Sequence, residues 1–182
     1  MVRDYNEAVL EYSLLSLGAL ELPVDTITPV CFLLERLGYS FNFHYSMTTT
    51  GLKSNQVNSK VNDMESNGLI ETNGCIKLTE AGRCTIEELM LDEQDFNRVH
   101  VFLNNYIALP PDMQYRVAVV QFVIYSHIKY NGEDTLVSEK PNIVKSINNI
   151  LGYDVEEENK LDEAMEFLRN ILKWRKKDDI SK

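Results

Sequence analysis

The chain has 182 residues, of which 44% are hydrophobic and 25% are charged, and its formal net charge is −10. These proportions are typical of a globular protein, and no apolar run reaches the length of a membrane span. The start of the chain lacks a signal-peptide pattern, and the three cysteines lack disulfide or zinc spacing, so we expect a cytoplasmic protein. The negative charge argues against indiscriminate nucleic-acid binding, which depends on Lys and Arg.

Residues 5–20 predict a helix that ends before Pro23. The side chains expected to face a core are Val9, Tyr12, Leu14, Leu15 and Leu17. A second, apolar helix follows, with Pro29 in its first turn and either Thr26 or Thr28 as its N-cap.

Residues 39–47 alternate aromatic and polar side chains with a period of two, which predicts a short strand with one aromatic face. These aromatic rings can pack in the core, which we favour, or stack on nucleic-acid bases. His44 is expected to be exposed rather than bound to a metal, since it has no second ligand. Cys31 is expected to be a small core residue.

A polar-faced helix is expected to begin after Ser54, a good N-cap residue, and to end at an Asn-Gly pair, positions 67–68. Its buried stripe would contain Val57, Val61 and Met64. Its opposite face carries Asn55, Gln56, Ser59, Lys60 and Asn62.

Two β-prone runs, residues 69–72 and 75–78, flank Asn73-Gly74. An Asn-Gly pair in this position predicts a hairpin with a type I′ turn, in which both residues have positive φ. Thr79-Glu80 then gives the start signal of another helix. This order of elements is typical of a winged helix, although it also suits a helix and a hairpin that merely complete a core.

The order of elements over residues 24–83 resembles the Panacea-type antitoxin domain: an apolar helix, an aromatic strand, a Gly-containing turn, a Ser-capped helix, Gly-Leu-Ile, a hairpin and Leu-Thr-x-x-Gly. That resemblance implies regulation through protein contacts, in some relatives the neutralisation of a toxin, rather than catalysis. A generic winged-helix transcriptional regulator is the competing resemblance, because the phrase beginning at Leu78 also closes many such domains.

We therefore expect a mainly α protein in which a winged helix-turn-helix domain with a small β-hairpin wing, residues 1–91, precedes a helical domain, residues 92–182. The second domain would pack on the first or dimerise. Its expected helices are 92–106, a central buried helix over 113–130, one from Ser138 to Gly152, and 156–177.

The last of these helices has an apolar seam of the kind that pairs helices, and we expect it to form a homodimer interface. The seam residues are Leu161, Met165, Leu168 and Leu172. Acidic residues crowd the start of this helix and basic residues its end, as the helix dipole favours, so the acidic cluster requires no metal.

The sequence contains no phosphate-binding loop, nucleophile elbow, His-Glu-x-x-His or Cys-x-x-Cys motif, so we expect no catalytic residues, no metal and no cofactor. Two hypotheses follow. The first is a dimeric DNA-binding transcriptional regulator, whose helix after Ser54 enters the major groove and reads adenine with Asn and Gln. The second is a protein-interaction module, such as an antitoxin, an adaptor or a complex subunit, which the acidic composition favours. The residues expected to contact DNA are Lys53, Ser54, Asn55, Gln56, Ser59, Lys60, Asn62, Lys77 and Arg83.

Overall fold

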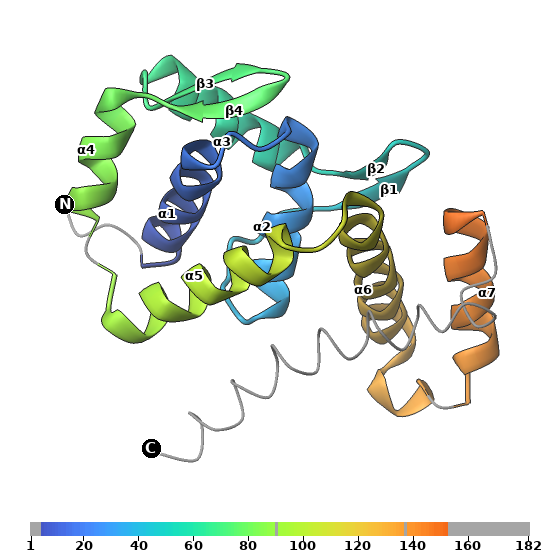
Figure 1. Ribbon diagram of the computed structural model, residues 1–182. Coiled ribbons are helices and arrows are strands. Elements are labelled where there is room, and N and C mark those ends of the chain that lie inside the picture. The colour runs from blue at the N-terminus through green and yellow to red at the C-terminus, as the bar shows by residue number, and fades with distance from the viewer. Residues whose placement is uncertain (1–4, 90, 137, 153–182) are drawn as a thin grey trace. The chain divides into compact units, whose positions relative to one another are not determined.

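The computed structural model describes residues 5–89, 91–136 and 138–152, which are mainly helical with two short two-stranded sheets (Figure 1). They divide into two compact units. Unit 1 contains residues up to 46 and 53–106, and unit 2 contains 47–52 and the residues from 107. The expected boundary at residue 91 stays a prediction about independently folding domains, because a compact unit is not by itself such a domain.

The main elements of unit 1 are α1 (Tyr5–Ala19), α2 (Ile27–Arg36), α3 (Asn55–Ser66), β3 (Ile70–Asn73), β4 (Cys75–Leu78), α4 (Glu80–Glu88) and α5 (Glu93–Ile107). The five core positions expected in α1 are all buried, which confirms the prediction. A Cβ atom on Gly18 would lie 3.2 Å from the backbone nitrogen of Leu78, so the glycine allows α1 to approach β4 closely.

Helix α2 is buried along most of its length, and burial raises the pKa of the Cys31 thiol, as expected of a core cysteine. The capping prediction was correct in position for Thr26 but wrong about the side-chain hydrogen bond. Thr26 is the N-cap residue but its side chain makes no cap hydrogen bond, and Thr28 lies buried inside the first turn. A short 3-10 turn, Val24–Thr26, leads directly into α2, and the Thr26 N–H bonds to the Pro23 carbonyl.

The predicted strand over residues 39–47 is absent apart from its end, where β1 (Ser46–Thr48) begins. Side chains still alternate between buried or half-buried aromatic residues and exposed polar residues, but Asn42 has a φ of +59°, which interrupts an extended chain. Side chains accept the backbone hydrogen bonds here: the Phe43 N–H donates to Glu35 Oε1 and the His44 N–H donates to Gln56 Oε1. With side-chain acceptors in place of a neighbouring strand, no ladder forms over these residues.

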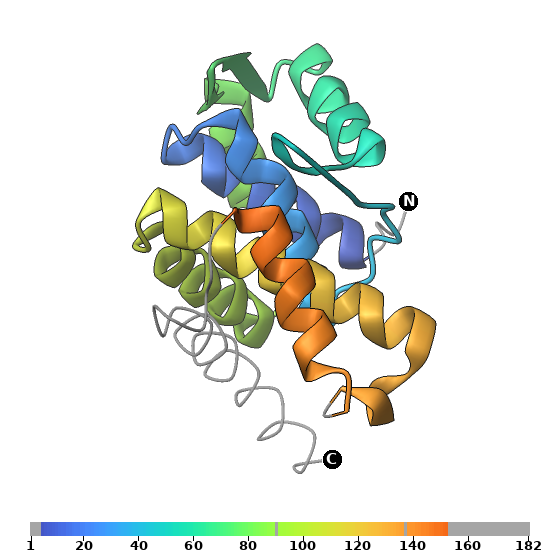
Figure 2. The same cartoon turned by 90° about the vertical axis from the view of Figure 1, so that its right-hand side faces the viewer.

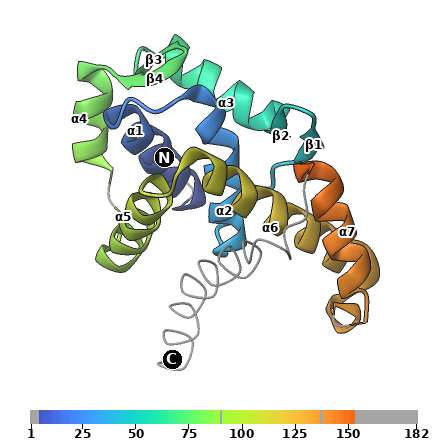
Figure 3. The same ribbon diagram turned by 45° about the vertical axis from the view of Figure 1, so that its right-hand side comes forward.

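Strands β3 and β4 form the predicted antiparallel hairpin, which lies against α1 between α3 and α4 (Figures 1 and 3). The type I′ prediction was wrong: Asn73 pairs with Cys75, and only Gly74 has positive φ. Contacts with the segment before α2 explain the difference. The Val24 N–H donates to the Gly74 carbonyl, and Pro23 forms a β-bridge with Cys75, so a third short extended segment borders β4.

Helix α5 is attached to the rest of unit 1 through Asp95. Both Tyr5 and Tyr39 donate a hydroxyl hydrogen bond to its carboxylate, the second at 2.7 Å. The ring of Phe96 lies 5.2 Å from that of Tyr12 on α1. Burial, together with the bond to Asp95, raises the pKa of Tyr39, so this hydroxyl remains a donor throughout the physiological range.

Unit 2 contains most of the hairpin formed by β1 and β2 (Gly51–Lys53), together with α6 (Pro111–Asn131) and α7 (Lys140–Leu151). The helix expected over 113–130 is confirmed, but its fully buried part is confined to residues 116–121. Gly152 ends α7, as predicted, and adopts the left-handed conformation. The expected helix 156–177 and its seam, Leu161, Met165, Leu168 and Leu172, lie outside the described residues.

Candidate interaction surface

Helix α3 lies at the periphery of unit 1 (turquoise in Figure 2) and is fixed by its apolar side. Val57, Val61 and Met64 are buried, as predicted. The Ser54 hydroxyl caps the helix by accepting from the Val57 N–H at 3.4 Å, an interaction of about 1 kcal/mol. Ser54 is itself buried, so it supports the helix and is unavailable to DNA. The stripe therefore leaves the polar side of α3 facing outward.

The outward side of α3 presents amides and hydroxyls. Asn55, Asn58, Ser59 and Asn62 are exposed, and their side chains make no hydrogen bond to any other described residue. Gln56 is also exposed, but it binds His44: its Oε1 accepts from the His44 N–H at 2.8 Å, and its Nε2 lies 3.3 Å from Nδ1. Among the predicted contacts, Asn55, Ser59 and Asn62 thus remain available to a partner, and Asn58 joins them.

Each of the four cations predicted to contact phosphates has a carboxylate of the same unit beside it. The nitrogen–oxygen distances are 3.5 Å for Lys53 and Asp25, 2.9 Å for Lys60 and Glu7, 3.7 Å for Lys77 and Glu21, and 3.9 Å for Arg83 and Glu80. Exposed pairs of this kind contribute about 0–1 kcal/mol each. Their importance is electrostatic, since each carboxylate offsets part of the attraction that its cation would have for a phosphate.

A groove of about 210 Å³ borders the outward side of α3. It lies between the start of α2, one side of α3 and the tip of the β3–β4 hairpin. Its lining residues are Val24, Ile27, Thr28, Val57, Asn58, Val61, Asn62, Thr72 and Gly74. The floor is aliphatic, and the rim consists of two amides and two hydroxyls, so the groove is neutral. We call it the α2–α3 groove.

One backbone donor of β3 is bonded to a side chain of α3. The Thr72 N–H and hydroxyl both donate to Glu65 Oε1, at 2.8 and 2.7 Å. These two hydrogen bonds lower the pKa of Glu65, so its carboxylate remains charged near neutral pH. A backbone donor that could pair with another strand is thereby satisfied within the chain.

The start of α4 fixes the hairpin to the end of α3. The Thr79 hydroxyl donates to the carbonyl oxygens of Gly68 and Leu69, at 2.6 and 3.0 Å, and accepts from the Gly82 N–H. A Cβ atom on Gly82 would lie only 2.2 Å from the Leu69 carbonyl oxygen. The Leu-Thr-x-x-Gly motif, residues 78–82, therefore packs α4 against the turn after α3. It helps to position the hairpin beside the groove but does not line the groove.

Sequence analysis missed the residues that complete this surface. Glu7 is 53 positions from Lys60, and Val24 and Thr28 precede the first residue of α3 by 31 and 27 positions, so no local pattern connects them to it. Their alignment with α3 depends on tertiary packing. The one available signal was compositional, since residues 1–37 carry a net charge of −4.

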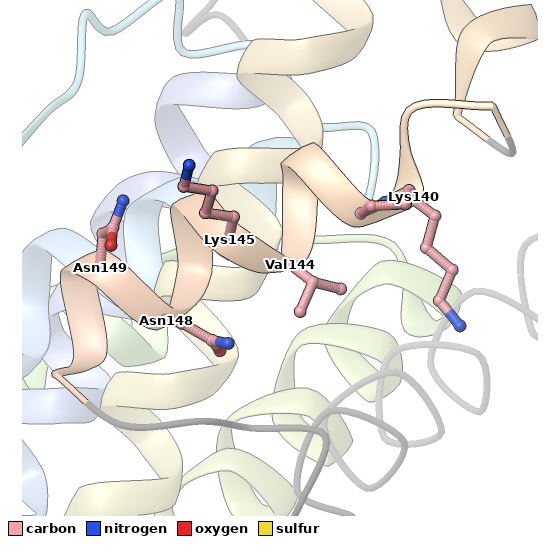
Figure 4. A pocket seen from close by; sticks show the side chains of 6 residues that line it. Lys140, Val144, Lys145, Asn148 and Asn149 are labelled. Atoms are coloured by element: carbon pink, nitrogen blue, oxygen red, sulfur yellow. The ribbon is translucent and has the colours of Figure 1, made fainter.

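Two depressions of unit 2 lie among the described residues. One of about 360 Å³ lies along α7, where Val144 and Asn148 extend from one side and Lys145 and Asn149 from another (Figure 4). Another, of about 320 Å³, includes His127, whose Nε2 lies 2.8 Å from the Thr135 hydroxyl. Over the described residues, no group of three or more His, Cys, Asp or Glu side chains is arranged to hold a metal.

Searches against protein-family models, curated proteins and solved structures return no match to this chain. None of the helices within the described ranges is both long and apolar enough to cross a membrane. The resemblance to the Panacea-type antitoxin domain stays a prediction.

Proposed function

We propose that this protein is a non-enzymatic regulatory protein that binds a protein partner through the outward side of α3. The observation that carries the proposal is the contrast on this surface: the amides and the α2–α3 groove are open, whereas all four nearby cations have carboxylate neighbours. DNA binding requires net positive charge at the interface. A protein partner requires shape and hydrogen-bonding groups, which this surface offers.

We infer a winged-helix scaffold as part of this proposal. Its support is the order α1, a short extended segment at Pro23 that borders β4, α2, α3 and the β3–β4 hairpin, although β1 and β2 lie between α2 and α3. The connection between α2 and α3, residues 37–54, is much longer than the three or four residues of a helix-turn-helix. A connection of this length argues against insertion of α3 into the major groove as in a helix-turn-helix protein, and so favours a protein partner.

The charge of unit 1 also favours a protein partner. Its residues from 5 to 46 and from 53 to 106 include six Lys or Arg against fourteen Asp or Glu, a net charge of −8. The surface would repel a phosphate backbone at long range, and more strongly at low salt. An antitoxin, an adaptor and a complex subunit all fit this description.

The second candidate function is the dimeric DNA-binding regulator. The observation that favours it is the set of exposed amides at positions 55, 58 and 62, which make no hydrogen bond to another described residue, since Asn can pair with adenine through two hydrogen bonds. In this case Lys53, Lys60, Lys77 and Arg83 would exchange their carboxylates for phosphates. The homodimer through residues 161–172 belongs to this candidate and remains a proposal.

Two measurements on the same protein separate the candidates. The first is a fluorescence titration of genomic DNA fragments at low salt, for which we expect no saturable binding at micromolar protein. The second is affinity capture from native cells with the wild type, Asn62→Arg and a control, Asn104→Arg, which changes an exposed residue of α5. We expect a partner that is retained by the wild type and the control and lost with Asn62→Arg. Saturable DNA binding that Lys60→Glu abolishes, without such a partner, would overturn the proposal.

A further inference from the structure

The α2–α3 groove has the size of one large side chain. Its volume of about 210 Å³ exceeds the ~150 Å³ of a cavity known to hold benzene. Ile27, Val57 and Val61 line the groove and are at most 7% exposed, so the core holds them in place and each presents only a small apolar area to the groove. One aliphatic or aromatic side chain can therefore bury itself against a firm apolar surface.

The rim of the groove can orient a polypeptide around that side chain. Asn58 and Asn62 each offer an amide with no hydrogen bond to another described residue. Two carboxylates adjoin residues that line the groove: Asp25 follows Val24, and Glu65 accepts a hydrogen bond from Thr72. Asp25 is 89% exposed although Lys53 lies 3.5 Å away. Positive groups on either side of an apolar anchor would complement this arrangement.

Other modes of binding are less suited to the site. An added strand would need the backbone donor of Thr72, which Glu65 already occupies. Nucleic acid would bring phosphates towards Asp25 and Glu65. A helical or irregular segment that inserts one side chain meets neither obstacle.

We propose that the α2–α3 groove is the docking site for a basic amphipathic segment of the partner protein. An aliphatic or aromatic residue of that segment fills the groove, and Lys or Arg residues on either side of it face Asp25 and Glu65. This inference rests on the proposed function and adds the chemistry of the partner.

Selection from a phage-displayed library of random 16-residue peptides tests the inference without a known partner. The wild-type protein is the bait, and Asn62→Trp, which fills the groove from its rim, is the counter-selection. We expect enriched peptides to contain a large apolar residue between Lys or Arg residues. Acidic peptides, or no enrichment over Asn62→Trp, would overturn the inference.

The strongest selected peptide is then measured by fluorescence anisotropy. Asn58→Trp and Asn62→Trp should each weaken its binding by about tenfold or more, whereas Asn104→Trp on α5 should leave it unchanged. Binding should also weaken as salt rises. Equal affinity for all three variants, each shown to be folded by circular dichroism, would place the peptide elsewhere and refute the site. Loss of the native partner with Asn62→Arg, combined with a failed selection, would refute this inference alone.

Discussion

Gly82→Ala should destabilise unit 1 severely, although alanine is the better helix former. The added Cβ would lie 2.2 Å from the Leu69 carbonyl oxygen, 2.6 Å from Leu78 Cδ1 and 3.2 Å from the Leu69 carbonyl carbon. Two of these three atoms belong to the backbone. Neither can move freely, because the Thr79 hydroxyl and N–H both bond to the Leu69 carbonyl.

The magnitude follows from two opposed effects. Overpacking costs about 1–3 kcal/mol or more, and backbone neighbours place this site at the upper end of that range. The better helix propensity of alanine returns about 1 kcal/mol. We therefore expect a net loss of about 2 kcal/mol or more in the free energy of unfolding.

Urea unfolding followed by circular dichroism measures this loss as a lower midpoint at an unchanged slope. Ala81→Gly is the matched control, because it exchanges the same two residues at an exposed neighbouring position of α4. It should cost about 1 kcal/mol from helix propensity alone. A midpoint for Gly82→Ala equal to or above that of the wild type would refute the close packing of α4 against the turn after α3.

Three further predictions concern other parts of the chain. Burial raises the pKa of Glu35 above its ordinary value of 4.5, so the folded state holds this proton more tightly and stability falls as the pH rises above 4.5. Glu35→Gln should remove that part of the pH dependence. If the difference in urea midpoint between this variant and the wild type is the same at pH 4.5 and at pH 7.5, the prediction is contradicted. Asn42, with a φ of +59°, should tolerate Gly, whereas Ala should cost about 1 kcal/mol in the same assay; equal midpoints for the two variants would argue against the left-handed conformation. Leu168→Asp should convert a dimer into a monomer by light scattering, and an unchanged mass would eliminate the proposed seam.

Local patterns in the sequence predicted the local parts of the fold. The Ser54 cap, the buried stripe of α3 and the Thr79 start of α4 each depend on residues within one or two turns, and all are present. The strand over 39–47 failed because alternation describes an extended chain but does not supply a neighbouring strand. Glu35 and Gln56 accept its backbone hydrogen bonds instead.

The candidate site could be predicted only in part, because its chemistry is assembled from distant residues. The helical spacing identified the polar side of α3, but on that basis we expected Lys60 to be available for a phosphate. Folding places Glu7 beside it, and brings Val24 and Thr28 to the groove. The type I′ turn failed for a related reason, since Val24 bonds to the hairpin tip at Gly74. Contacts between residues far apart in the chain produce no periodic pattern in the sequence, so they could not be predicted from it.

The most direct test of the central claim is photo-cross-linking in native cells from a benzoylphenylalanine residue at position 62, compared with the same residue at position 104. The account predicts that one protein is cross-linked from position 62, is identified by mass spectrometry, and is not captured from position 104. Cross-linking to DNA from position 62, or the same set of proteins from both positions, would contradict it.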